Sequence, residues 1–398
     1  MKNRREGLVI FLLSLVFIIA VSRILIYRDN YQWDFRAEYY SARAYLAGLN
    51  PYDIKAVSRI NEFVLFPTAH SPVNLFFFLF FAKFDYQTAY CLYLILKCVL
   101  LFLLIYLWRN KFLDRQVDII FYLLCAFAFN CAIYLDLRSG NISILEQSVI
   151  WLALFYYLKG RLIPFCALII FISTFKMQPI LLLSLLLFTE NRKKYAYLLG
   201  SLAVFGFVFF VLYLFEPLLL KNFITSALAT TRQIESGIDN PIDTPSTLVF
   251  MRGLAQSLSR ATGITLFNKI YWLAYLSVIT VVILLSQRAY SYIRTWNMPD
   301  KKKWVIFLTC LVYVLVVVRL KDFSYIILIV PTYFIIRRVT CINAYALLFL
   351  LAVVPTFDMP RHFIGNYYPL LMAYLMWILY LYEISFRHKQ KDYKQVEI

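Results

Sequence analysis

The chain has 398 residues, of which 62% are hydrophobic and 16% charged, and its mean hydropathy is +0.70. Such a composition excludes a soluble globular protein and predicts an all-α, polytopic membrane protein. The formal net charge of +18 does not indicate nucleic-acid binding, because the Lys and Arg residues stand in short clusters between apolar runs. The seven cysteines lie inside apolar segments without paired spacing, so we expect no disulfide or metal site from them.

The first apolar run, residues 8–27, follows the basic residues Lys2, Arg4 and Arg5. It can be an uncleaved anchor or a cleaved signal peptide with a cleavage-like triplet at residues 20–22. The apolar pattern resumes at residues 24–26, which favours the anchor. The basic N-terminus is then expected to stay in the cytoplasm.

The remaining apolar runs predict helices along the rest of the chain. They fall at 86–108, 117–135, 142–158, 161–175, 179–190, 194–215, 268–288, 303–318, 322–336, 341–355 and 364–385. One path through the membrane places every basic cluster in the cytoplasm, including the tail 386–398, and gives an even number of crossings, about twelve. Residues 72–84 are too short for the roughly 30 Å hydrocarbon layer and predict a re-entrant segment.

The polar, helix-breaking segments without basic clusters all emerge on the outer side along this path. They are 27–71, 136–141, 176–179, 216–267, 319–322 and 356–363. We therefore interpret 1–398 as a single integral membrane domain with one external cavity at the membrane surface. In it, 27–71 is an external loop with the site acid, and 216–267 is a long external loop whose residues 249–258 form a short helix on the membrane.

Asp34 is the first candidate for catalysis. It follows the first membrane helix and precedes an aromatic helix, predicted from Phe35 to Ala47, and an Asn-Pro turn. A carboxylate in this place suits a general base held at the bilayer surface. Capping of the aromatic helix is the open alternative, because Asp is a favoured N-cap residue.

Lys176 is the most informative cation, since it stands beside Gln178 and Pro179 at a tight turn between two short helices. A lysine there is costly unless it meets an anion, which favours a phosphate-binding role, with a structural pair to Glu146 as the alternative. Lys97, near a helix end, is expected to snorkel to the membrane surface.

The other charged candidates have simpler alternatives. Arg36 can hold lipid phosphates, and Lys321 with Asp322 can form a structural pair at a helix start. His70 and His362 are single histidines without a second ligand at metal spacing, so a metal site is not expected.

Two functional classes remain open from the residues alone. One is an enzyme acting on a lipid-linked substrate, and the other is a polytopic transporter or flippase for a lipid-linked or small anionic substrate. A transporter would bind its substrate near the bilayer midplane. The polar groups gather at one membrane face, which favours the enzyme. A structural protein would leave the recurrent external polar breaks unexplained.

The order of several motifs resembles that of a known family. Asp34-Phe35, Tyr39-Tyr40, Ala42, Gly48 and Asn50-Pro51-Tyr52 resemble the N-terminal signature of the polyprenol-phosphate-sugar-dependent glycosyltransferases of family 87. This family belongs to the C-type superfamily, which includes bacterial membrane alpha-mannosyltransferases acting on glycolipids. Later segments are similar in the same order: His70-Ser71-Pro72, Gly140-Asn141, 176–179, Pro245-Ser246-Thr247 with Arg252, and 319–331. The late motif departs from the family, because Lys321-Asp322 stands where a histidine is common.

The resemblance implies a C-type architecture with short external interfacial helices. It also implies an inverting transfer of mannose or another hexose or pentose from a polyprenyl-phosphate donor to a lipid-linked or glycan acceptor. The reaction is expected on the outer face of the bacterial cytoplasmic membrane, without metal, other cofactor or nucleic acid. Asp34 would be the base. The donor phosphate would be bound by Lys176, Arg252, Lys321 and Arg319, and the sugar or acceptor by Arg36, Tyr39, Tyr40, Tyr52, His70, Asn141, Gln178 and Asp322.

Overall fold

The computed structural model describes residues 2–27, 31–115, 117–236, 244–264, 266–339, 343–353 and 367–396. Within these ranges the chain is helical and contains no strand. It divides into two compact units. The first unit comprises Met1–Lys111 and Ile133–Ile238, and the second comprises Phe112–Ala132 and Asp239–Ile398.

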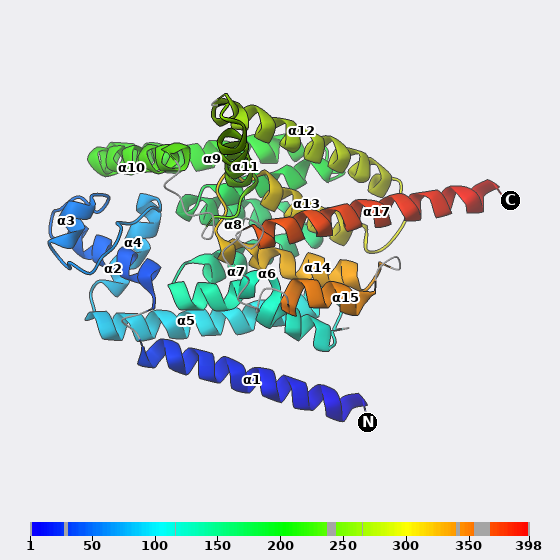
Figure 1. Cartoon of the computed structure of the whole chain (residues 1–398), viewed down its shortest axis with the longest axis horizontal. Helices are drawn as coiled ribbons and strands as arrows, with labels where there is room; N and C mark the ends of the chain where they lie inside the picture. Colours follow the sequence, from blue (N-terminus) through cyan, green and yellow to red (C-terminus); the bar gives the residue numbers. More distant parts are fainter. Residues whose placement is uncertain are drawn as a thin grey trace. The chain divides into compact units, whose positions relative to one another are not determined.

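The first unit begins with two long helices that lie side by side (Figure 1). These are α1 (Lys2–Ile26) and α5 (Tyr86–Leu107), and the rings of Phe17 and Phe102 meet across them at 5.8 Å between centroids. Asp85 caps α5, because its side chain accepts a hydrogen bond from the Thr88 N–H at 3.0 Å. Between α1 and α5 lie three short helices, α2 (Trp33–Leu46), α3 (Ile54–Ser58) and α4 (Pro72–Phe81).

The rest of the first unit packs around α7 and α8. Helix α7 contacts both α5 and α8, and Trp108 packs edge-on against Trp151 at 5.8 Å between centroids. The elements of this part are α7 (Ser143–Leu158), α8 (Leu162–Phe175), the 3-10 helix η3 (Gln178–Phe188), α9 (Lys194–Phe215) and α10 (Pro217–Ser236). The break between α8 and η3 carries Lys176, as the sequence predicts.

The second unit is built around α13, most of whose residues are buried. Trp304 of this helix packs against Phe334 and Tyr380, at 5.0 and 4.9 Å between centroids. The elements of the unit are α11 (Thr247–Thr262), α12 (Phe267–Arg294), α13 (Lys301–Val316), the 3-10 helix η4 (Asp322–Leu328), α14 (Ile329–Ile336), α15 (Ala344–Leu348), the π-helix η5 (Phe349–Val353) and α17 (Tyr368–Val396).

Two elements lie at the chain positions where one unit passes into the other. They are the π-helix η2 (Trp108–Phe112) and α6 (Ile119–Ser139). Helix α6 loses its helical backbone from Ala128 to Cys131, where Phe129, Asn130 and Cys131 have φ values of 53°, 58° and 56°. The α6 segment after this break, residues 133–139, belongs to the first unit and leads into the candidate site.

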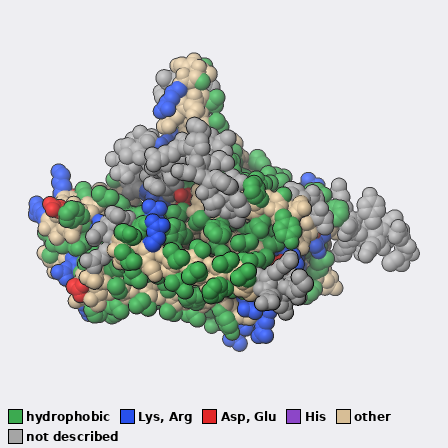
Figure 2. Space-filling view, turned by 60° about the horizontal axis from the view of Figure 1, so that its bottom comes forward, with side chains coloured by type: hydrophobic (Ala, Val, Ile, Leu, Met, Phe, Trp, Pro, Cys, Tyr) green, Lys and Arg blue, Asp and Glu red, His purple; other side chains and the backbone are tan. Residues whose placement is uncertain are grey.

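Six of the described helices are long and apolar enough to cross a membrane. They are residues Gly7–Ile26, Tyr86–Phe112, Ile119–Ser139, Lys194–Phe215, Ile270–Arg294 and Tyr368–His388. Hydrophobic side chains cover much of the face shown in Figure 2, as expected for helices that meet lipid. The expected number of about twelve crossings stays a prediction, because the other apolar helices are only 10–17 residues long.

Most helix boundaries agree with the apolar runs of the sequence to within a few residues. The clearest difference is α10, which lies in the segment 216–267 that the sequence analysis interprets as a long loop. Leu219, Leu220 and Phe223 bury one face of α10, so the polar residues between them mark an amphipathic helix instead of a loop. The expected short helix at residues 249–258 is present within α11. The segment 356–363, with His362, lies outside the described residues.

Candidate active site

Asp34 lies in the first turn of α2 and contacts the α6–α7 corner. Asn141 donates a hydrogen bond from Nδ2 to Asp34 Oδ2 at 2.9 Å. The N-cap of α2 is Gln32, and the helix begins at Trp33. The capping alternative for Asp34 is therefore wrong, because its backbone is already helical. Its carboxylate instead contacts a segment more than 100 residues away in the chain.

A glycine allows this close approach. Gly140 has a φ of +73°, and a Cβ added to it would lie 2.5 Å from Gln32 Oε1 and 2.7 Å from the Cβ of Phe35. The Gln32 N–H donates to the Arg138 carbonyl at 2.7 Å, and the Gln32 side chain donates to the Leu137 carbonyl. The start of α2 is thus attached to the end of α6, which brings Asn141 to Asp34.

Lys176 lies on the other side of the same asparagine. Its Nζ donates to Glu146 Oε2 at 2.8 Å, to Ser143 Oγ at 2.9 Å and to Asn141 Oδ1 at 3.1 Å. The pair with Glu146, which the sequence analysis gives as the alternative to phosphate binding, is therefore present. Because Asn141 presents its N–H group to Asp34 and its carbonyl oxygen to Lys176, the amide separates the carboxylate from the ammonium group.

A second ion pair holds the corner that carries Asn141. Lys97 is 1% exposed, and its Nζ lies 2.8 Å from Asp136 Oδ2. The same carboxylate accepts hydrogen bonds from the backbone N–H groups of Ser143 and Ile144, at 3.1 and 3.3 Å, in the first turn of α7. The expectation that Lys97 snorkels is wrong, because its charge is paired inside the protein instead of reaching the membrane surface.

Glu38 is a buried site carboxylate that the sequence analysis missed. It is 4% exposed and lies four residues after Asp34 on α2. Its Oε2 accepts from Thr68 Oγ1 and Asn74 Nδ2, both at 2.8 Å, and its Oε1 lies 2.7 Å from His70 Nδ1. The signal in the sequence was the spacing of four residues, which places Glu38 and Asp34 on one helix face.

The predicted sugar-binding tyrosines lie close to these groups in the first unit. The hydroxyl of Tyr39 donates to the Phe84 carbonyl at 2.7 Å, and that of Tyr52 donates to the His70 carbonyl at 3.1 Å. Burial raises the pKa of Tyr39, and burial together with the charge of Glu38 raises the pKa of Tyr52. Both hydroxyls therefore stay protonated and structurally engaged, and their contact with a sugar stays a prediction.

Three further predicted residues belong to the first unit. Arg36 and Tyr40 are half-buried on α2, and the Tyr40 ring stacks on Tyr86 at 5.5 Å between centroids. Gln178 is half-buried at the start of η3, two residues after Lys176. These positions are compatible with a site on this part of the unit, and their ligand roles stay predictions.

The remaining predicted residues belong to the second unit. Arg252 of α11 is 5% exposed, and its Nε and Nη1 atoms are buried without a hydrogen-bond partner among the described residues. Arg319, Lys321 and Asp322 are half-buried around the start of η4. The expectation that Arg252, Arg319 and Lys321 bind the donor phosphate with Lys176 stays a prediction, as does sugar or acceptor binding by Asp322.

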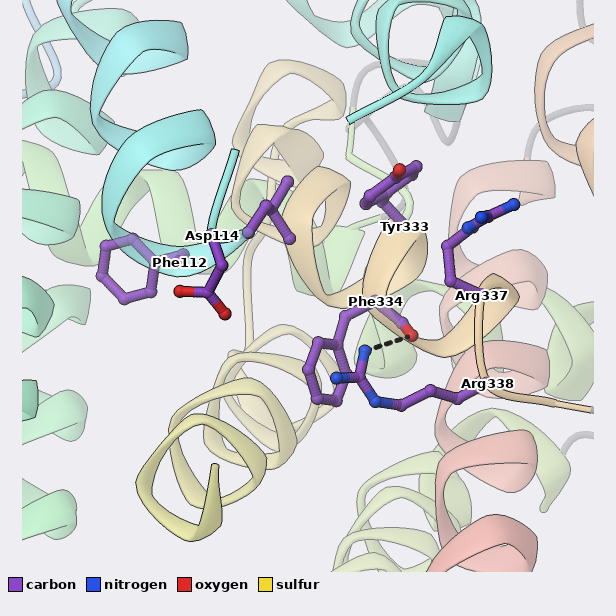
Figure 3. A pocket seen from close by; sticks show the side chains of 7 residues that line it. Phe112, Asp114, Tyr333, Phe334, Arg337 and Arg338 are labelled. Carbon is purple, nitrogen blue, oxygen red and sulfur yellow. Dashed lines mark hydrogen bonds between the residues drawn. The ribbon is translucent and has the colours of Figure 1, made fainter. Parts of the chain in front are cut away.

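A pocket of about 100 Å³ in the second unit contains none of the predicted site residues (Figure 3). Its lining includes Arg338, whose guanidinium group lies 3.5 Å from the ring centroid of Phe334, and Arg337, which pairs with Asp118 at 3.2 Å. These cations are already satisfied by the protein, so the pocket carries no functional assignment.

The comparison with family models decides the class of the protein. The model of glycosyltransferase family 87 matches residues 69–318, more than half of the chain. The chain belongs to glycosyltransferase family 87. It is therefore a membrane glycosyltransferase, which requires a sugar donor and an acceptor and works among membrane lipids. The predicted family and enzyme class are confirmed, which decides against the transporter alternative. No curated protein and no solved structure matches the chain.

The matched region contains only part of the candidate site. His70, Asn141, Lys176, Gln178 and Arg252 lie inside residues 69–318. The predicted residues of α2 and Tyr52 precede the matched region. Arg319, Lys321 and Asp322 follow it. Family membership therefore establishes the enzyme class, whereas the role of Asp34 has to be argued from its contacts.

Replacing Lys97 tests whether the buried ion pair supports the site. We expect Lys97→Met to lower the free energy of unfolding by about 3–5 kcal/mol, because it leaves the Asp136 carboxylate buried and unpaired. Lys97→Met/Asp136→Asn should recover part of the loss, since Asn can still accept a hydrogen bond from the start of α7. Thermal unfolding in detergent measures both effects. A Lys97→Met variant as stable as the wild type would contradict the account.

Replacing Gly140 tests the close approach between α2 and α6. Gly48 is a matched control, because its φ is +72° but no atom lies within 4 Å of an added Cβ. Gly48→Ala should cost about 1–2 kcal/mol of stability, the price of a left-handed backbone for alanine. Gly140→Ala should cost clearly more and also lower sugar transfer, because the added Cβ pushes α2 away from Asn141. Equal effects of the two substitutions on unfolding temperature and transfer would argue against this role.

Proposed function

We propose that this glycosyltransferase moves mannose, or another hexose or pentose, from a polyprenyl-phosphate donor to a hydroxyl of a lipid-linked or glycan acceptor. The observation that carries the proposal is the hydrogen-bonded chain from Asp34 through Asn141 to Lys176. It offers a carboxylate and an ammonium group on either side of one fixed amide. Transfer of a sugar from a phosphate donor requires both charges. The carboxylate removes the proton of the acceptor hydroxyl, and the ammonium group stabilises the leaving phosphate.

In the proposed reaction, Asp34 takes the proton of the acceptor hydroxyl while that oxygen attacks the anomeric carbon. The bond between the anomeric carbon and the phosphate oxygen breaks, and polyprenyl phosphate leaves with the electron pair. Attack from the face opposite to the phosphate inverts the anomeric configuration. Asn141 keeps Asp34 apart from Lys176, so that the base is not consumed by a direct ion pair with that lysine.

Lys176 is proposed to bind the donor phosphate by exchanging one anion for another. Its ammonium group pairs with Glu146, whose side chain is only 2% exposed. The Lys176 side chain itself is 11% exposed, so it remains accessible to a ligand. A phosphate brings more negative charge than a carboxylate and forms strong charge-assisted hydrogen bonds with an ammonium group.

Arg252 is a candidate for binding a phosphate anion, argued from the second unit alone. A guanidinium group that is 5% exposed is costly unless an anion accompanies it. Its buried Nε and Nη1 atoms have no hydrogen-bond partner in the described part of the chain, which fits an anionic ligand. Arg319 and Lys321 are proposed as additional phosphate-binding cations.

The location proposed for the reaction is the outer face of the bacterial cytoplasmic membrane. The support comes from the distribution of charge, because every basic cluster can occupy the cytoplasmic side while the residues around Asp34 and Lys176 emerge opposite. In a polyprenyl-phosphate donor the leaving group is the lipid phosphate, so no nucleotide site is needed. The sequence contains no Asp-x-Asp pair and no Gly-rich phosphate loop for a nucleotide sugar.

Asp34→Asn tests the function and the base together. Asparagine keeps the size of the side chain and an oxygen that can accept from Asn141, so the fold should persist. Loss of the base should reduce transfer by a factor on the order of 10²–10⁴. Purified protein is incubated with four donors, the polyprenyl-phosphate derivatives of mannose, glucose, galactose and arabinose. The octyl glycosides of the same sugars serve as acceptors, and released polyprenyl phosphate is measured. No release by the wild type sinks the proposed donor, and near-normal turnover by Asp34→Asn sinks the assignment of the base.

Variants of Lys176 and Glu146 test the proposed exchange of anions. Lys176→Gln alone should lower stability, because it strands a buried carboxylate, whereas Lys176→Gln/Glu146→Gln should regain it. Polyprenyl phosphate should raise the unfolding temperature of the wild type. It should act on Glu146→Gln at lower lipid concentration, since the competing carboxylate is gone.

The double variant provides the decisive comparison. It should be folded but gain much less stability than the wild type from polyprenyl phosphate, because it lacks the ammonium group. Thermal unfolding in detergent over a range of lipid concentrations gives the comparison. A double variant stabilised as strongly as the wild type would show that Lys176 does not bind the phosphate.

A further inference from the structure

Glu38 occupies the centre of a buried polar cluster beside Asp34. Its two oxygens face three donors, the hydroxyl of Thr68, the amide of Asn74 and Nδ1 of His70, at 2.7–2.8 Å. Among the described residues, His70 is the only group within 4 Å of this carboxylate that can carry a positive charge. With both oxygens engaged, Glu38 is not itself placed to receive a proton from a substrate. Its contacts instead fix the position of the histidine ring.

The contact with Glu38 determines which nitrogen of His70 carries the proton. A carboxylate can only accept a hydrogen bond, so Nδ1 is the donor and Nε2 of the neutral ring keeps its lone pair. The side chain of His70 is 16% exposed, and Nε2 makes no hydrogen bond to any described residue. The ring therefore offers one oriented hydrogen-bond acceptor to a molecule outside the protein.

The backbone around His70 connects the helix of Asp34 to the segment of Lys176. Ser71, the next residue, donates from its N–H to the Phe175 carbonyl at 3.5 Å and from its hydroxyl to the Thr174 carbonyl. Both acceptors directly precede Lys176. On the other side, the ring of His70 contacts Glu38, one helical turn after Asp34. His70 thus lies on a segment that is attached both to the helix of Asp34 and to the residues that directly precede Lys176.

We propose that His70, oriented by Glu38, binds a sugar hydroxyl through Nε2 during glycosyl transfer. The inference rests on the proposed function. It extends the prediction that His70 binds the sugar or acceptor, because it names the atom that makes the contact and the residue that orients the ring. A sugar hydroxyl matches the position because it can donate to Nε2 while its oxygen still accepts other hydrogen bonds. The hydroxyl belongs either to the acceptor or to the donor sugar. Glu38 is a positioning residue, since it acts on the substrate only through the ring of His70.

The test compares four variants under the assay used for Asp34. His70→Ala removes the ring, and His70→Asn removes Nε2 but keeps an N–H donor for Glu38, so the buried carboxylate stays paired. Glu38→Gln keeps the size of the side chain and removes its charge. His388→Ala is the matched control, because that ring stacks on Tyr292 at 4.2 Å in the second unit. For each variant, kcat and KM are measured with the donor and octyl glycoside that give the fastest turnover, and unfolding temperature is recorded.

Both His70 variants should lower kcat/KM about tenfold to a hundredfold, because they leave the sugar hydroxyl without its hydrogen-bond partner. Glu38→Gln should lower kcat/KM about tenfold, as expected for loss of a residue that orients a ligand-binding histidine. Added imidazole should restore part of the activity of His70→Ala, and it should not affect His388→Ala. A raised KM for the octyl glycoside assigns the hydroxyl to the acceptor, and a raised KM for the lipid donor assigns it to the donor sugar.

The proposal is overturned if His70→Asn turns over like the wild type. It is also overturned if activity falls only in proportion to stability, with no rescue of His70→Ala by imidazole and no change in either KM. These outcomes are distinct from failure of the proposed function. If the wild type releases polyprenyl phosphate and Asp34→Asn does not, normal turnover by the His70 variants rejects this inference alone. If the wild type releases none, the proposed function fails and the inference fails with it.

Discussion

The candidate site depends on one buried ion pair, between Lys97 of α5 and Asp136 of α6. Two charges removed from water are stable only when each has its partner and its hydrogen bonds, and Asp136 also accepts from the first turn of α7. The pair therefore fixes the corner between α6 and α7. Asn141 lies in that corner, and from there it reaches both Asp34 and Lys176. An ion pair with no proposed role in the chemistry thus sets the geometry of the groups that are proposed to act on the substrate.

The first unit keeps its two α2 carboxylates in different surroundings, which supports the different roles proposed for them. Glu38 faces a hydroxyl, an amide and a histidine that occupy both of its oxygens, so it serves as a fixed orienting group. Asp34 contacts the amide of Asn141, which leaves it suited to accept a proton. Lys176 is separated from Asp34 by the same amide and is neutralised by Glu146 until a ligand arrives. Distinct partners, rather than distinct residue types, separate the base, the orienting acid and the counter-ion.

The sequence predicted the apolar helices well, because long apolar runs and basic clusters are local signals that survive without knowledge of packing. It also singled out Asp34, Asn141 and Lys176, since polar residues at helix breaks are unusual in so apolar a chain. Pairings between distant residues were not predictable in the same way. Lys97 and Asp136 are 39 residues apart, and nothing local shows that they meet. Glu38 reads as an ordinary residue of an aromatic helix, and α10 was missed because its apolar residues share their segment with Ser and Thr.

The central claim is that Lys176 exchanges Glu146 for the phosphate of a lipid donor while Asn141 continues to hold Asp34. A cryo-electron microscopy structure of the protein with polyprenyl phosphate measures this most directly. The account predicts a phosphate oxygen about 3 Å from Lys176 Nζ, a Lys176 side chain that has left Glu146, and an unchanged contact between Asn141 and Asp34. A phosphate bound elsewhere, with Lys176 still paired to Glu146, would contradict it.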